Sequence, residues 1–150
     1  MSSKEYWMRR AIDLARYCHT PYAAIITDEN GKLIAQKANT VKNDIDPTAH
    51  AEINAIRKAC TLRKSTKLNG CVIYSTVEPC SMCASAIAWS GIDKIVFGAT
   101  IGDVIALNGN QFNLSLSDFY ESLGYNADIT PFYLRDECED LVRQFNHDIA

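Results

Sequence analysis

The stretch CVIYSTVEPCSMCASAIAWSG, residues 71–91, decides the fold because it joins two elements of different type. Residues 71–76 form a continuous β-branched and aromatic run, which is typical of a strand buried on both faces of a sheet. Pro79 suits the first position of a helix and Gly91 suits its end, so we predict a helix between them. A buried strand that leads into a helix is the building unit of an α/β domain.

Strands and helices alternate on both sides of this stretch. Before it, we predict a helix over residues 4–18, strands over 23–27 and 33–37 joined by a turn at 28–31, and a helix over 49–62. After it, we predict a strand over 95–97, a loop at 108–110, a helix over 116–123, a strand over 128–134 and a helix over 136–147. This order predicts a single α/β domain over residues 1–150, with a largely parallel sheet after the initial hairpin.

Composition and charge exclude several classes of protein. The 150 residues include 15 basic and 18 acidic side chains, and this balance lacks the positive field of non-specific nucleic-acid binders. No apolar stretch approaches the roughly 20 residues that a membrane-spanning helix needs. Charged side chains run through residues 1–18, where an export signal would need an apolar core. We therefore expect a cytoplasmic protein with no nucleic-acid or membrane partner.

The role of the six cysteines depends on whether the chain resides in an oxidising or a reducing compartment. They are Cys18, Cys60, Cys71, Cys80, Cys83 and Cys138. A chain of this length can bury a core without disulfides, so in a reducing compartment we expect buried thiols or metal ligands. Cys60 and Cys71 fit core positions, on an apolar helix face and at the start of a strand.

Two short motifs carry chemistry, His50-Ala51-Glu52 and residues 79–83, and each lies where a helix is predicted to begin. Cys80 and Cys83 are three residues apart, so both sulfurs can hold one ion near a helix N-terminus, where thiolates are favoured. One histidine and two thiolates leave the fourth position of a tetrahedral zinc ion open to water, as in a catalytic site. Residues two apart do not share a helix face, so we predict that His50 lies at an extended helix start from which Glu52 reaches that water.

The combination of His50-Ala51-Glu52 with Pro79-Cys80-Ser81-Met82-Cys83 resembles the signature of zinc-dependent nucleobase and nucleoside deaminases. The resemblance runs from the first helix to about Ala99, and its two motif blocks look like those of the guanine deaminase and tRNA adenosine deaminase branch. It implies a three-layer α/β/α cytidine-deaminase-like fold, a mixed and mostly parallel sheet, a catalytic Zn²⁺ held by His50, Cys80 and Cys83, Glu52 as the proton shuttle, and a homodimer.

The resemblance also suggests where the substrate binds. It implies that Asn39 contacts the substrate, and we add Tyr22, Ala51 and Trp89 as candidate substrate-binding residues, with Tyr22 and Trp89 also fitting the core or the pocket wall. Trp89 and residues 130–133 resemble segments of guanine deaminases, whereas the acidic residues of the last helix would repel a phosphate backbone. We therefore expect hydrolysis of guanine to xanthine, or of guanosine, with release of ammonia.

Several alternatives stay open because two segments depart from the family pattern. Residues 22–24 replace the usual Gly-Ala step with Ala-Ala, and residues 103–126, which commonly shape the substrate mouth, match poorly. Deamination of a tRNA adenosine to inosine, or of cytosine, is therefore kept as an alternative. A zinc-stabilised pseudo-deaminase subunit is the non-enzymatic alternative, although a purely structural site would not need Glu52.

Overall fold

A mixed five-stranded sheet forms the centre of the computed structural model, in which residues 1–145 are described. The strands are β1 (Ala23–Thr27), β2 (Leu33–Ala38), β3 (Val72–Val77), β4 (Lys94–Ala99) and β5 (Asp128–Thr130), in the spatial order β2-β1-β3-β4-β5. β1 runs antiparallel to both β2 and β3, whereas β3, β4 and β5 are parallel. The α/β class, with a parallel sheet after the initial hairpin, is confirmed.

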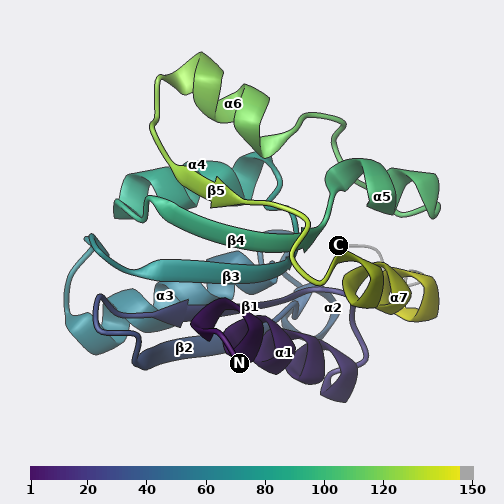
Figure 1. Cartoon of the computed structure of the whole chain (residues 1–150), viewed down its shortest axis with the longest axis horizontal. Coiled ribbons are helices and arrows are strands. Elements are labelled where there is room, and N and C mark those ends of the chain that lie inside the picture. Colours follow the sequence, from purple (N-terminus) through teal and green to yellow (C-terminus); the bar gives the residue numbers. More distant parts are fainter. Residues whose placement is uncertain (146–150) are drawn as a thin grey trace.

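Helices cover both faces of this sheet and complete three layers (Figure 1). They are α1 (Ser3–Tyr17), α2 (Val41–Asp44), α3 (Ala51–Arg63), α4 (Ser81–Ser90), α5 (Ile101–Ala106), α6 (Leu116–Leu123) and α7 (Arg135–Phe145). α1 packs on β1 and β3 and α7 packs on β4, while α3 covers β1 and β2 from the other face and contacts α4. None of the helices within residues 1–145 is long and apolar enough to cross a membrane.

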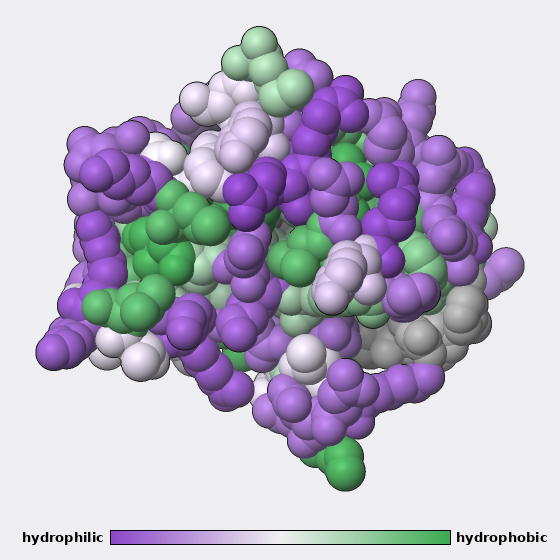
Figure 2. All heavy atoms as spheres, turned by 90° about the horizontal axis from the view of Figure 1, so that it is seen from below, coloured by the Kyte–Doolittle hydropathy of each residue, from purple (hydrophilic) through white to green (hydrophobic). Residues whose placement is uncertain are grey.

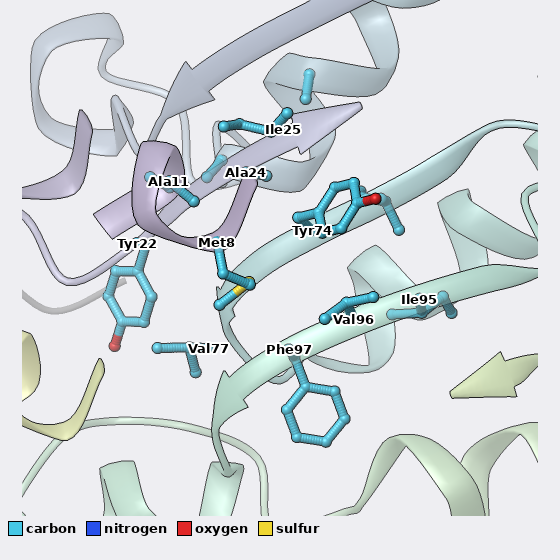
Figure 3. Packing of buried hydrophobic residues seen from close by; sticks show 14 of the residues in the cluster. Met8, Ala11, Tyr22, Ala24, Ile25, Tyr74, Val77, Ile95, Val96 and Phe97 are labelled. Atoms are coloured by element: carbon cyan, nitrogen blue, oxygen red, sulfur yellow. The ribbon is translucent and has the colours of Figure 1, made fainter. Parts of the chain in front are cut away.

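The core lies between α1 and the central strands. Met8, Ala11, Ile12 and Ala15 of α1 are buried at the spacing of one helical face. All of β1 is buried, as its continuous apolar sequence predicts for a strand with a neighbour on each side. Figure 3 shows Met8 and Ala11 over the central strands, with Tyr22 and Val77 at one end of the cluster. This packing holds the start of β1 beside the end of β3.

The edge strand β2 presents a polar surface. Its exposed side chains include Gln36 and Lys37, and Figure 2 shows hydrophilic residues over much of the face on this side of the molecule, with smaller hydrophobic patches between them. Charged side chains on an edge strand discourage pairing with a further strand.

Three predicted element bounds need correction, and two short helices were not predicted. The helix predicted from Pro79 begins at Ser81, because Cys80 is extended and its carbonyl accepts the first helical bond from Ala84 at 2.7 Å. The strand predicted over 128–134 ends at Thr130, since Pro131 lacks an N–H and the chain turns directly afterwards. The short helices α2 and α5 were not predicted. α7 begins at Arg135, and the last two residues of the helix predicted over 136–147 lie outside the described part of the chain.

Candidate active site

The starts of α3 and α4 lie at one edge of the sheet and carry the motif residues. His50 and Cys80 are the N-cap residues of these helices, and both have extended backbone conformations, with φ and ψ of −67° and 155° for His50 and −71° and 173° for Cys80. An N-cap side chain does not follow the helical face of the residues behind it. His50 therefore lies at an extended helix start, as the role predicted for Glu52 requires.

His50, Cys80 and Cys83 form a compact group of metal donors. The Nδ1 atom of His50 lies 3.6 Å from each of the two sulfurs, and the three donor atoms are all within 4.8 Å of one another. A tetrahedral zinc ion with usual bond lengths separates a nitrogen and a sulfur ligand by about 3.6 Å. The spacing and the chemistry of these donors fit zinc.

The two thiols are electrostatically unequal. A hydrogen bond with Cys83, joined by one with His50, lowers the pKa of Cys80 to about 4, although burial opposes the shift. The same contact between the sulfurs, together with burial and the charge of Glu52, raises the pKa of Cys83. Burial disfavours the charged imidazole, but the hydrogen bond to Cys80 and the charge of Glu52 raise the pKa of His50. One thiolate is thus already favoured, as cation binding requires.

Glu52 lies beside this group and is buried, with 6% of its surface exposed. Burial, and next the negative charge of Cys80, raise its pKa to about 7. A carboxyl group with a pKa near neutrality can both accept and return a proton at cellular pH. It lines a cavity of about 10 Å³, which is about the space of one water molecule.

A larger cavity adjoins the small one at the surface. Its volume is about 210 Å³, and it is lined by Pro47, His50, Cys80, Met82, Asn110, Gln111 and Phe112. The donor atoms therefore face a hollow that a ligand can enter from outside. Drug-sized ligands occupy roughly 300–1,000 Å³, so this cavity suits a smaller molecule.

The candidate substrate residues do not all meet here. Tyr22 is buried and lines the small cavity with Glu52, because β1 runs antiparallel to β3 and its start lies beside Val77. Ala51 is fully buried in the first turn of α3. Asn39 is held next to Tyr22 by a 3.0 Å hydrogen bond from its backbone N–H to the Tyr22 carbonyl, but its side chain lines a neighbouring hollow.

The amide of Asn39 carries an unsatisfied donor. Its Oδ1 accepts a 3.0 Å hydrogen bond from the N–H of Val41, whereas Nδ2 is buried and finds no partner within the described residues. Leaving such a donor unpaired costs about 1–3 kcal/mol. A ligand acceptor at this position would recover that cost.

Trp89 is not brought to the cavity. Six residues separate it from Cys83 along α4, which places it about 9 Å further along the axis and on another side of the helix. Its side chain is 78% exposed. This position does not fit its predicted place in the core or in the wall of the described pocket.

Sequence reasoning did not identify the residues that line the larger cavity opposite the metal donors. Asn110, Gln111 and Phe112 come from the connection between α5 and α6, within residues 103–126, a segment that the sequence linked to the substrate mouth without indicating which residues form it. Glu78 is also buried at the small cavity. The available signal was topological, because loops that follow the carboxyl ends of parallel strands commonly form ligand sites in α/β sheets.

Residues 1–99 match the cytidine and deoxycytidylate deaminase zinc-binding region. The chain belongs to this deaminase family. The family is defined by its zinc-binding region, and zinc is therefore the ion that the donor group of His50, Cys80 and Cys83 is suited to hold.

Relatives within this family act on different substrates. The chain is 41% identical to the tRNA-specific adenosine deaminase of Aquifex aeolicus over 100 residues, which are 64% of this chain and 66% of the relative. It is 38% identical to the guanine deaminase of Bacillus subtilis over 102 residues, which are 63% and 64% of the two chains. Both alignments thus span slightly less than two thirds of the relative.

A solved guanine deaminase from Nitrosomonas europaea shares the fold of almost the whole chain. The two structures superpose with a TM-score of 0.80 at 27% identity, covering 97% of this chain and 83% of the other. The three-layer cytidine-deaminase-like architecture is therefore confirmed beyond residue 99, where the family match ends.

Proposed function

We propose that this chain is a zinc-dependent aminohydrolase that converts guanine to xanthine, or deaminates guanosine, with release of ammonia. The observation that carries the proposal is the buried carboxyl of Glu52 next to the donors His50, Cys80 and Cys83. A purely structural zinc site has no use for a buried acid with a pKa near 7. The chain would act as one deaminase domain over its whole length.

The residues of this site divide the chemistry between them. His50, Cys80 and Cys83 would hold the ion. When bound, zinc supplies the Lewis acidity that makes a water molecule nucleophilic near neutral pH. Glu52 takes a proton from that water, passes it to a ring nitrogen and helps to protonate the departing nitrogen. The water oxygen forms a bond to the carbon that carries the amine, the carbon–nitrogen bond breaks, and the products are a carbonyl compound and ammonia.

A free purine base is the substrate that the cavities support best. The larger cavity, at about 210 Å³, is smaller than those that hold drug-sized ligands. The unpaired Nδ2 of Asn39 lies at a neighbouring hollow, so it adds no contact to a base in this cavity. The likeness to two guanine deaminases, one in sequence and one in structure, supports the same choice.

A tRNA adenosine is the second candidate, favoured by the 41% identity to a tRNA-specific adenosine deaminase. The surface of α7 argues against it. Asp136 and Asp140 are exposed there, and Glu137 and Glu139 are partly exposed. Arg9, Arg135 and Arg143 pair with Glu137, Glu139 and Asp140, but α7 keeps more acidic than basic side chains, and this excess disfavours the phosphate backbone of RNA.

Ammonia release from a panel of substrates tests the proposal. We expect the zinc-loaded chain to release ammonia from guanine or guanosine, and the variant Glu52→Ala to lose this activity. The panel also holds adenine, cytosine, cytidine and a tRNA anticodon stem-loop. Turnover of cytosine or of the stem-loop alone would assign another substrate. No turnover of any compound by zinc-loaded protein would favour the pseudo-deaminase alternative.

We also propose that the chain forms a homodimer through the exposed ends of α3 and α4. These helices pack side by side, and Leu62 and Trp89 near their C-terminal ends are 56% and 78% exposed. Exposed apolar residues on neighbouring elements mark protein interfaces.

We expect Trp89→Ala to shift the sedimentation coefficient toward that of a monomer. Ile45→Ala, which removes an even more exposed apolar side chain elsewhere, should leave the sedimentation coefficient unchanged. A monomeric wild-type chain would contradict the proposal.

A further inference from the structure

Glu78 anchors the segment that runs from the start of α5, through the connection that follows it, to the start of α6. One carboxylate oxygen of Glu78 accepts a hydrogen bond from the N–H of Ile101 at 2.9 Å, and the other accepts one from the N–H of Leu116 at 2.7 Å. These are the first residues of α5 and α6. Hydrogen bonds to a buried carboxylate are among the stronger ones in proteins. Glu78, two residues before the ligand Cys80, therefore holds the starts of both helices near the site.

Further contacts fix the course of this connection. Asp103 closes a capping box with Thr100 and accepts two hydrogen bonds from Arg135 of α7, at 2.9 and 2.7 Å. The N–H of Gly109 donates to the carbonyl of Val104 at 2.8 Å, and a Cβ at Gly109 would collide with Val104. This hydrogen-bonded turn directs residues 110–112 toward the site.

Gln111 occupies a special position on this connection. Among residues 1–145, three line both the small cavity that holds Glu52 and the larger cavity that opens outside. Two of them are the metal donors His50 and Cys80, and the third is Gln111. Its side chain also lies near Tyr22 at the small cavity: burial raises the pKa of Tyr22, and the Gln111 amide opposes this rise. A base that enters the larger cavity and approaches the donors therefore meets Gln111 in the cavity wall.

The chemistry of this amide matches one edge of guanine. A glutamine amide offers an N–H donor and a carbonyl acceptor side by side. Guanine presents a carbonyl acceptor at C6 beside an N–H donor at N1, which is the complementary pair. In 2,6-diaminopurine the C6 group is an amine, so the donor and acceptor of this edge are exchanged. Only an amide held in one orientation distinguishes the two edges, and Tyr22, which lines the same small cavity, is the neighbour placed to hold it.

We propose that Gln111 is a specificity-determining residue that hydrogen-bonds to the carbonyl edge of the purine. The inference rests on the proposed function and deepens it. Gln111 lies outside the region matched to the family, which ends at residue 99, so the family match assigns it no role. Two observations support the inference. Gln111 lines both cavities, and hydrogen bonds to Glu78 hold the segment that carries it.

The test compares guanine with 2,6-diaminopurine as substrates and as ligands. We expect Gln111→Ala to lower kcat/KM for guanine by about tenfold to hundredfold, as loss of one or two hydrogen bonds predicts. Gln111→Glu places acceptors opposite the guanine carbonyl, so we expect it to reduce guanine turnover further while 2,6-diaminopurine is affected less. Zinc content and Tm, measured for each variant, identify any that fails to fold.

Two further variants show whether Gln111 contacts the substrate or only stabilises the connection between α5 and α6. Asn113→Ala removes an exposed amide from the same connection and should leave both substrates unaffected. Tyr22→Phe removes the hydroxyl that contacts Gln111. We expect the double variant Tyr22→Phe/Gln111→Ala to keep the greater loss for guanine. Equal losses for both substrates in every Gln111 variant would overturn the inference and leave the deaminase function standing.

Direct binding distinguishes failure of this inference from failure of the proposed function. Calorimetry with guanine and 2,6-diaminopurine needs no turnover. If the chain binds guanine without deaminating it, the proposed function fails, and a greater loss of affinity for guanine in Gln111→Ala still supports the inference. If wild-type protein binds neither purine, the inference is overturned.

Discussion

Replacing Glu52 with glutamine is expected to lower kcat for deamination by about 10⁴-fold, the upper end of the range for proton-transfer catalysis. The size follows from the two tasks of one carboxyl group, which removes a proton from the water and returns protons to the substrate. Glutamine keeps the volume and a hydrogen-bonding side chain but cannot transfer the proton. We therefore expect zinc content and the Kd for guanine to stay close to those of the wild type.

Steady-state ammonia release and calorimetric titration with guanine check this prediction together. Glu121→Gln is a suitable control, because it removes the charge of an exposed glutamate on α6 and should leave kcat unchanged. A loss of less than tenfold in Glu52→Gln would show that another group moves the proton. Loss of zinc from this variant would instead assign Glu52 to the metal site.

The parts of the fold that sequence could predict are those governed by local pattern. The apolar stripe of α1, the turn after β1, the bounds of α6 and the stop of α4 at Gly91 follow from spacing and from glycine conformation. The start of α4 was wrong because Cys80 adopts an extended conformation that directs its sulfur to His50. That requirement comes from a contact with another helix, which local pattern does not contain.

The same division applies to the site. His50, Cys80 and Cys83 could be selected from the spacing of their motifs. His50 lies at the start of α3, and the two cysteines lie at the start of α4. Gln111 could not, because its place depends on hydrogen bonds that two distant backbone N–H groups donate to Glu78. Trp89 was assigned from a short motif, and helical geometry carries it away from Cys83. The motifs identified the metal donors and Glu52, whereas the residues that line the substrate cavity are placed by tertiary contacts.

Zinc is expected to raise the Tm of the chain by roughly 8–16 °C when its free concentration is about a thousandfold above Kd. Binding to the folded state alone contributes about 4 kcal/mol at that ratio, and 1 kcal/mol corresponds to roughly 2–4 °C for a chain of this size. The donors reinforce the effect, because without a cation the Cys80 thiolate lies near the buried carboxyl of Glu52. Thermal unfolding with zinc and with a chelator measures the shift.

Two cysteine variants show whether the shift arises at the assigned donors. Cys83 and Cys138 are both fully buried, but Cys138 packs against Gly98 and belongs to no metal-donor group among the described residues. Cys83→Ala should remove most of the response to zinc, because two donors bind the ion far more weakly than three. Cys138→Ala should lower the Tm in chelator through the cavity it leaves, yet keep the full shift. An undiminished shift in Cys83→Ala would mean that zinc stabilises the chain from another site.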